Sequence, residues 1–169
     1  MRFFCVIIFC LFIAGPLTSQ PVASATGTLT DPLGRTVILP AHPQRVVSLA
    51  PGITEIIFDI QREQYLKGVT QYSDYPPAAR RLPKIGSYVA LDLEKIVALK
   101  PDLCIAVKDG NPKRVIDRLE SLGIPVYAVD PKNLTSVMET IVAIGGLLGA
   151  NENAARIVAQ MRARIRAVE

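Results

Sequence analysis

Apolar residues along the chain follow two alternating patterns. Short apolar or β-branched runs typical of buried strands lie at 45–49, 103–107 and 126–129, and a further short strand is expected at 66–70. Apolar residues at helical spacing occupy 53–60, 93–99, 112–122 and 134–148, with Asn133 placed to cap the last helix. Strands and helices that alternate in this way form parallel βαβ units with helices on both faces of the sheet. The pattern therefore predicts a Rossmann-like α/β sandwich with a parallel sheet.

The segment before the first core strand predicts a β-hairpin. Its turn, Asp31-Pro32-Leu33-Gly34, has Pro at the second position and Gly at the last, between extended runs at 27–30 and 35–39. A link that contains Pro40 and Pro43 then leads into the first core strand.

A last helix is predicted from about Glu152 to the end of the sequence. Ile157, Met161, Ile165 and Val168 share one of its faces. We favour an apolar stripe that has no partner within this chain over a helix that folds back on its own domain. The expected organisation is thus an α/β ligand-binding lobe at 26–150 and a separate helical segment at 151–169.

The N-terminus predicts export. Met1 and Arg2 precede an apolar run over 3–14, and small residues follow at Ala23-Ser24-Ala25. This order of charge, apolar run and small residues is typical of a cleaved secretory signal peptide, and the run is shorter than the roughly 20 residues of a membrane-spanning helix. We expect a signal peptide at 1–25, a periplasmic mature chain and no stable membrane insertion.

Charge and motifs exclude several classes of function. A net charge of +4 is too mild to indicate nucleic-acid binding. The chain has neither G-x-G-x-x-G nor a P-loop, so nucleotide chemistry is not predicted. The single histidine, His42, lies far in sequence from Cys104, so no cluster has the spacing of a metal site. Ser48 has no second histidine that could serve as its base. We therefore expect no metal site, no cofactor and no enzyme. A small exported α/β enzyme is the alternative from another class, and it would need a catalytic constellation.

The loops that follow the strands are the candidate binding surface, because open α/β sheets place ligands beyond the carboxyl ends of their strands. The candidate residues in three of these loops are Ser48, Pro51, Tyr72, Ser73, Asp74 and Tyr88. Tyr72 and Tyr88 leave different loops on one rim, where their rings offer flat amphipathic faces to a large planar ligand. Lys108 is the only obvious base among these loops.

Three segments carry a family resemblance. They are 45–51 together with Thr54-Glu55, the run Tyr72-Ser73-Asp74-Tyr75-Pro76-Pro77, and 93–103. From about Thr28 to its end the chain resembles the helical-backbone periplasmic binding proteins for iron complexes and cobalamin. The Tyr-Ser-Asp-Tyr-Pro-Pro run is similar to the vitamin B12-binding branch of that family.

The resemblance implies a fold, a ligand and partners. Members of the family have two α/β lobes joined by one long helix, clamp the ligand between the lobes, and dock on the membrane permease of an ABC importer that an ATPase drives. This sequence resembles the first lobe and the start of the long helix, so the second lobe is expected to be absent from it.

By the same resemblance, Tyr72 contacts the corrin, Tyr88 stands where a cobalamin binder has Trp, and Glu94 pairs with a permease arginine. The implied ligand is cobalamin, a corrinoid. A ferric siderophore or haem on the same scaffold is the alternative, and either would want basic groups at the cleft.

Overall fold

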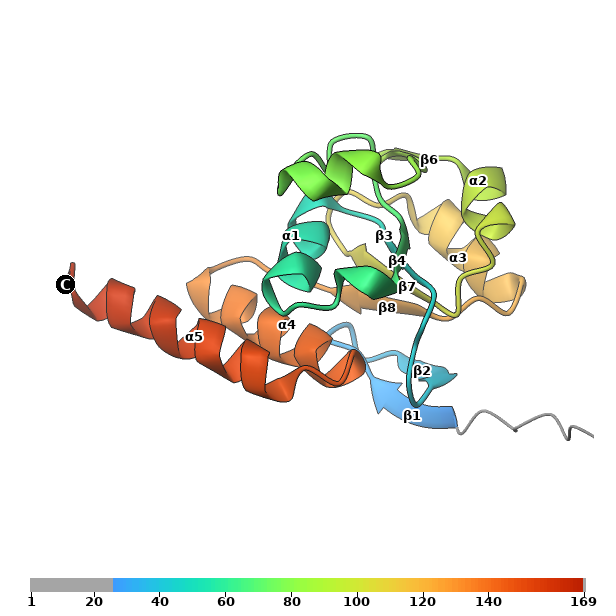
Figure 1. Cartoon of the computed structure of the whole chain (residues 1–169). Helices are drawn as coiled ribbons and strands as arrows, with labels where there is room; N and C mark the ends of the chain where they lie inside the picture. Colours follow the sequence, from blue (N-terminus) through green and yellow to red (C-terminus); the bar gives the residue numbers. More distant parts are fainter. Residues whose placement is uncertain (1–25, 169) are drawn as a thin grey trace, which may run out of the picture.

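The computed structural model describes residues 26–168, and the predicted signal peptide at 1–25 lies outside them. Its centre is a parallel four-stranded sheet in the order β4-β3-β7-β8 (Figure 1). The strands are β3 (Val46–Ser48), β4 (Leu66–Gly68), β7 (Leu103–Val107) and β8 (Val126–Val129). Within the described part of the chain, the helices are all too short or too polar to cross a bilayer.

Helices cover both faces of this sheet. One face carries α1 (Pro51–Asp59), α4 (Leu134–Leu147) and α5 (Asn151–Arg166), and the other carries α2 (Leu93–Ala98) and α3 (Lys113–Ser121). Successive residues of β7 alternate between the two sides, so that Leu103 and Ile105 pack with α1 and α4 while Cys104 packs with α2 and α3. The predicted α/β sandwich with a parallel sheet is confirmed.

Local signals start the helices where the sequence predicts. Asn133 caps α4 through its side chain, which accepts a hydrogen bond from the Ser136 amide at 2.9 Å, and Ser136 Oγ accepts one from the Asn133 amide at 2.9 Å. Pro51 occupies the first turn of α1, where an amide hydrogen would have no partner in the helix. The predicted N-cap at Asn133 is confirmed.

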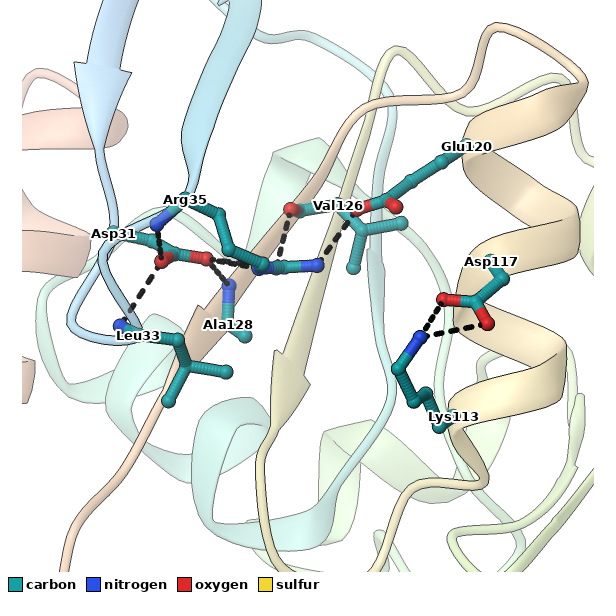
Figure 2. Close-up of polar contacts among 8 residues, drawn as sticks. All are labelled: Asp31, Leu33, Arg35, Lys113, Asp117, Glu120, Val126 and Ala128. Atoms are coloured by element: carbon teal, nitrogen blue, oxygen red, sulfur yellow. Dashed lines mark hydrogen bonds and ion pairs between the residues drawn. The ribbon is translucent and has the colours of Figure 1, made fainter.

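The predicted N-terminal hairpin is confirmed, and it docks on the edge of the sheet. Strands β1 (Thr26–Thr30) and β2 (Thr36–Pro40) pair antiparallel. At their turn Asp31 is 3% exposed, and its carboxylate accepts from the Ala128 amide at 3.4 Å. Arg35 donates to the Val126 carbonyl at 3.1 Å and pairs with Glu120 at 2.7 Å (Figure 2). Side chains of the turn thus occupy backbone groups of the edge strand β8.

The first half of α5 folds back on the lobe, which corrects the expectation of a stripe without a partner. Ala154 and Val158 are buried, and Ile157 and Met161 pack against the core that α4 shares. A Cβ at Gly145 of α4 would lie 2.5 Å from the Cβ of Ala154, so the two helices approach each other as closely as a glycine permits. The far half of α5 extends beyond α4 in Figure 1, and its side chains there are mostly exposed.

Candidate functional site

Tyr72 and Tyr88 lie on neighbouring segments at the β4 edge of the sheet. Beyond β4, the chain continues beside residues 83–86, with the Gln71 amide donating to the Gly86 carbonyl at 2.8 Å. Tyr72 follows this hydrogen bond by one residue and Tyr88 follows it by two, so both leave the parallel segments at the same end. Their exposed fractions are 57% and 38%. The structure therefore brings the two tyrosines to one rim and leaves both rings accessible.

Ser48 and Ser73 belong to a buried network of hydroxyl groups beneath this rim. The Thr54 hydroxyl lies 2.9 Å from Ser48 Oγ and 3.1 Å from Ser73 Oγ, and Thr70 Oγ1 lies 2.9 Å from Ser73 Oγ. All four residues are buried. The expectation that Ser48 and Ser73 touch a ligand directly is corrected here, because their side chains lie inside and join the first loop to the second.

Hydrogen bonds from Lys84 stabilise the loop that carries Tyr72. The Lys84 ammonium donates to the Ser73 carbonyl at 2.9 Å and to the Ala79 carbonyl at 3.1 Å. Desolvation by burial lowers the pKa of Lys84, and the carboxylate of Asp74 opposes that shift. Asp74 itself is exposed, so it remains a rim residue, and Pro51 is half-buried at the start of α1.

Asn111, which the sequence pattern did not single out, joins three parts of the site. Its Oδ1 accepts from the Val107 amide, and its Nδ2 donates to the Leu49 and Tyr88 carbonyls, each at 2.8 Å. These partners belong to the ends of β7 and β3 and to the loop between β5 (Gly86–Ser87) and β6 (Ala90–Leu91). The only available signal was an asparagine in the loop that follows β7, a loop already expected to face the ligand.

The predicted rim base, Lys108, is engaged in an ion pair. Its ammonium lies 3.3 Å from Asp130 Oδ2, and Lys132 lies 2.9 Å from the same atom. The hydrogen bond from Lys132, joined by Lys108 and opposed by desolvation, lowers the pKa of Asp130. An anionic ligand at this rim would have to compete with Asp130 for the positive charge.

Reactive groups do not gather at the rim. Across residues 26–168 the structure has no cluster of three or more histidine, cysteine or acidic side chains that could hold a metal ion. Cys104 is buried, and desolvation raises the pKa of its thiol to about 12. The thiol therefore stays protonated at neutral pH and is a poor nucleophile. This arrangement can bind a ligand through surfaces and hydrogen bonds.

Glu94 lies in the first turn of α2, on the face of the sheet that α2 and α3 cover. Its side chain is exposed, and the helix start is capped by Asp92, whose carboxylate accepts from the Lys95 amide at 3.0 Å. The backbone hydrogen bonds and the ammonium of Lys95 lower the pKa of Asp92. The capping is therefore complete without Glu94, whose carboxylate is free for an external contact or for the helix dipole.

A groove of about 590 Å³ opens between α1, α4 and α5. Its floor is apolar and includes Ile53, Val137 and Met161, while Glu55 and Arg164 stand among its lining residues. The candidate residues predicted from the sequence do not line it. The two tyrosines thus lie outside the groove.

A parallel α/β lobe with an accessible, braced rim at its strand ends has the architecture of a lobe of a solute-binding protein. The chain belongs to the periplasmic binding protein family, whose model matches residues 46–169. The family resemblance seen in the sequence is therefore confirmed.

Relatives of known name agree with this family. The chain is 34% identical over 151 residues to the vitamin B12-binding protein of Yersinia pestis, and this match covers 89% of this chain and 53% of that protein. It is 42% identical over 97 residues to the vitamin B12-binding protein of Pectobacterium carotovorum, which covers 57% of this chain and 35% of that protein. The chain thus spans about half the length, or less, of these relatives.

Solved structures show the same lobe. The periplasmic vitamin B12-binding protein of Vibrio cholerae matches with a TM-score of 0.69 and 34% identity, over 74% of this chain and 49% of that one. A periplasmic heme-binding protein from Pseudomonas aeruginosa matches with a TM-score of 0.71 and 30% identity, over 74% of this chain and 45% of that one. In both proteins the matched lobe makes up a little less than half of the chain.

Proposed function

We propose that this chain captures cobalamin in the periplasm as the substrate-binding component of an ABC importer, delivers it to a membrane permease driven by an ATPase, and performs no catalysis. The observation that carries this proposal is the pair of accessible tyrosines, Tyr72 and Tyr88, on adjacent segments at the strand ends. The vitamin B12-binding relatives from Yersinia and Vibrio support the choice of ligand.

A corrin is a broad, flat ring with apolar faces, and such a ligand suits aromatic side chains that bury a large area while losing few rotamers. Asp74, exposed beside Tyr72, can accept hydrogen bonds from the amide groups at the edge of the ring, and Pro51 adds an apolar contact at the start of α1. In this proposal Ser48 and Ser73 do not contact the ligand but stabilise the binding loops, because a loop that is already ordered loses less conformational freedom on binding.

The charge of the rim favours cobalamin over the alternatives. Haem and many ferric siderophores carry carboxylates or other anionic groups, which need free cations at the site. Lys108 is paired with Asp130, and Lys84 is directed into backbone carbonyls. A heme-binding protein is nevertheless among the structural relatives, so haem and a ferric siderophore are the competing ligands in the test.

Titration of the chain with cyanocobalamin, haem and a ferric siderophore, read by absorbance and calorimetry, tests the proposal. We expect cyanocobalamin to bind most tightly, and Tyr72→Ala to weaken it by about ten- to a hundred-fold, the effect of removing roughly 1–3 kcal/mol of aromatic contact. Tyr72→Phe should keep most of the affinity if the ring face carries the contact.

Tyr65 is a suitable control, because it is a half-buried tyrosine that packs on the core just before β4, at the opposite end of that strand. Tyr65→Ala should lower the melting temperature and leave the affinity of the folded protein unchanged. Tyr72→Ala should do the reverse, because the exposed Tyr72 ring contributes little to the core. Preferential binding of haem, or an unchanged affinity in Tyr72→Ala, would contradict the proposal.

A further inference from the structure

The β5–β6 hairpin that presents Tyr88 is too small to hold this side chain in place by itself. Each of its strands has two residues, and a hairpin of that size is unstable in isolation. Within the hairpin, Ser87 Oγ accepts from the Val89 and Ala90 amides, both at 3.2 Å, which shapes the turn without anchoring it. The position of Tyr88 must therefore be set by contacts from elsewhere in the lobe.

Asn111 supplies such a contact. Asn111 is 8% exposed. Its side-chain oxygen accepts from the Val107 amide, and its side-chain nitrogen donates to the Leu49 and Tyr88 carbonyls, at 2.8 Å each. A buried amide with its donors satisfied in this way rigidly links the groups it bridges. The Tyr88 backbone is thereby tied to the ends of the two central strands.

Gly110 supplies a second contact, to the ring. A Cβ at Gly110 would lie 2.9 Å from Cδ2 and Cε2 of Tyr88, and the φ of Gly110 is +124°, which side chains with a Cβ rarely adopt. The Tyr88 ring therefore lies directly against the backbone of the loop after β7. The backbone of Tyr88 and its ring are held by two consecutive residues.

We propose that Gly110 and Asn111 are the positioning residues of the ligand site, which set the height and tilt of the Tyr88 ring above the strand ends. The inference rests on the proposed function only in taking Tyr88 as a ligand contact; the positioning itself concerns the chain without ligand. Asn111→Asp is the informative change, because it keeps the size and the acceptor but replaces the two donor hydrogens by an oxygen that faces two carbonyls.

The first test needs no ligand. The sequence contains no tryptophan, so Tyr88→Trp introduces a single reporter at the proposed position. We expect Asn111→Asp in this background to shift the emission to longer wavelength and to raise acrylamide quenching about twofold, as the indole moves into solvent. Should Asn111→Asp fail to fold, Gly110→Ala is the second variant. It brings a Cβ against the residue-88 ring and leaves the Asn111 side chain itself unaltered, and it should alter the emission in the same way.

Asn133→Ala is the matched control, because it removes an asparagine that caps α4 and has no bond to the Tyr88 loop. It should lower the melting temperature, because α4 loses its cap, and leave the indole emission unchanged. An emission that responds equally to Asn133→Ala and Asn111→Asp, or to neither Asn111→Asp nor Gly110→Ala, would overturn the positioning role.

The second test is a double-mutant cycle with cyanocobalamin as the ligand. Asn111→Asp should weaken binding about tenfold in the unmodified chain and less than twofold in the Tyr88→Ala background, because it acts through Tyr88. Equal losses in both backgrounds would overturn the proposal. If the unmodified chain does not bind cyanocobalamin, the proposed function fails by itself, and the indole emission still decides whether Gly110 and Asn111 position residue 88.

Discussion

Asp31→Ala is expected to be among the most destabilising single changes outside the apolar core. The carboxylate is buried at the hairpin turn, where it accepts from the Leu33 amide at 3.0 Å and the Arg35 amide at 2.9 Å and pairs with the Arg35 guanidinium at 2.7 Å (Figure 2). It also accepts from the Ala128 amide of β8. Alanine would remove every one of these acceptors at once.

The magnitude follows from what is left behind. Removing one partner of a buried charge pair costs about 3–5 kcal/mol, but the Arg35 side chain is about one-third exposed and keeps its contacts with Glu120 and Val126. Solvent at Arg35 reduces the loss, whereas the stranded turn amides add to it. We therefore expect about 3 kcal/mol, or a fall in melting temperature of about 6–12 °C for a domain of this size.

Urea unfolding followed by circular dichroism measures this difference, with Asp117→Ala as the control. Asp117 pairs with Lys113 at 2.7 Å on the exposed face of α3, within the same view of Figure 2, and an exposed pair of this spacing contributes about 0.3–0.5 kcal/mol. If the two alanine variants unfold at the same urea concentration, the hairpin does not stabilise the sheet edge in the way described.

Further predictions concern the buried thiol, the docking residue and the last helix. Burial raises the pKa of Cys104 from an ordinary value of 9.0 to about 12 in the folded protein, so ionisation of the unfolded thiol should lower stability above pH 9, by about 1.4 kcal/mol at pH 10. Cys104→Ala should lack that loss, and an identical pH profile of stability for both proteins would refute the assignment. Glu94→Ala should slow uptake in a reconstituted importer without changing ligand affinity, whereas unchanged uptake would leave Glu94 as a helix-terminus acid. Backbone amides of α5 should be protected from hydrogen exchange as far as the buried Val158, and their protection should decrease towards Val168, which is 86% exposed. Uniform protection along the helix would contradict this.

Much of the lobe was predictable because its sheet is parallel and covered on both faces. Such strands are continuous apolar runs, and 103–107 and 126–129 stand out as runs of this kind between helices with a clear 3.6-residue period. The order of strands and helices then leaves few topologies open. The rim could be located for the same reason, since the ends of parallel strands lie at one edge of the sheet.

The packing of α5 was not predictable from large apolar residues alone. The stripe of Ile157, Met161 and Ile165 suggested a missing partner, but the contact with α4 is centred on the small residues Gly145 and Ala154. Small residues allow close helix approach without contributing to an apolar pattern. The direction in which α5 packs therefore depends on a fit between backbones that periodicity does not record.

Asn111 and the buried hydroxyl groups escaped prediction for a different reason. The bonds of Asn111 to Leu49 and Tyr88 span 62 and 23 residues of sequence, so its role exists only once three loops have been assembled. Ser48 and Ser73 were correctly placed in loops at the strand ends, but only the tertiary structure shows that their hydroxyl groups face each other through Thr54.

The docked hairpin also bears on how the protein avoids aggregation. An edge strand with free backbone groups is a template for strands of other chains. Here the turn residues Asp31 and Arg35 occupy groups of β8, and the segment 83–86 lies against the opposite edge at β4. A variant that loses the hairpin contact should therefore begin to aggregate at a lower protein concentration than a variant that is equally destabilised but keeps this contact.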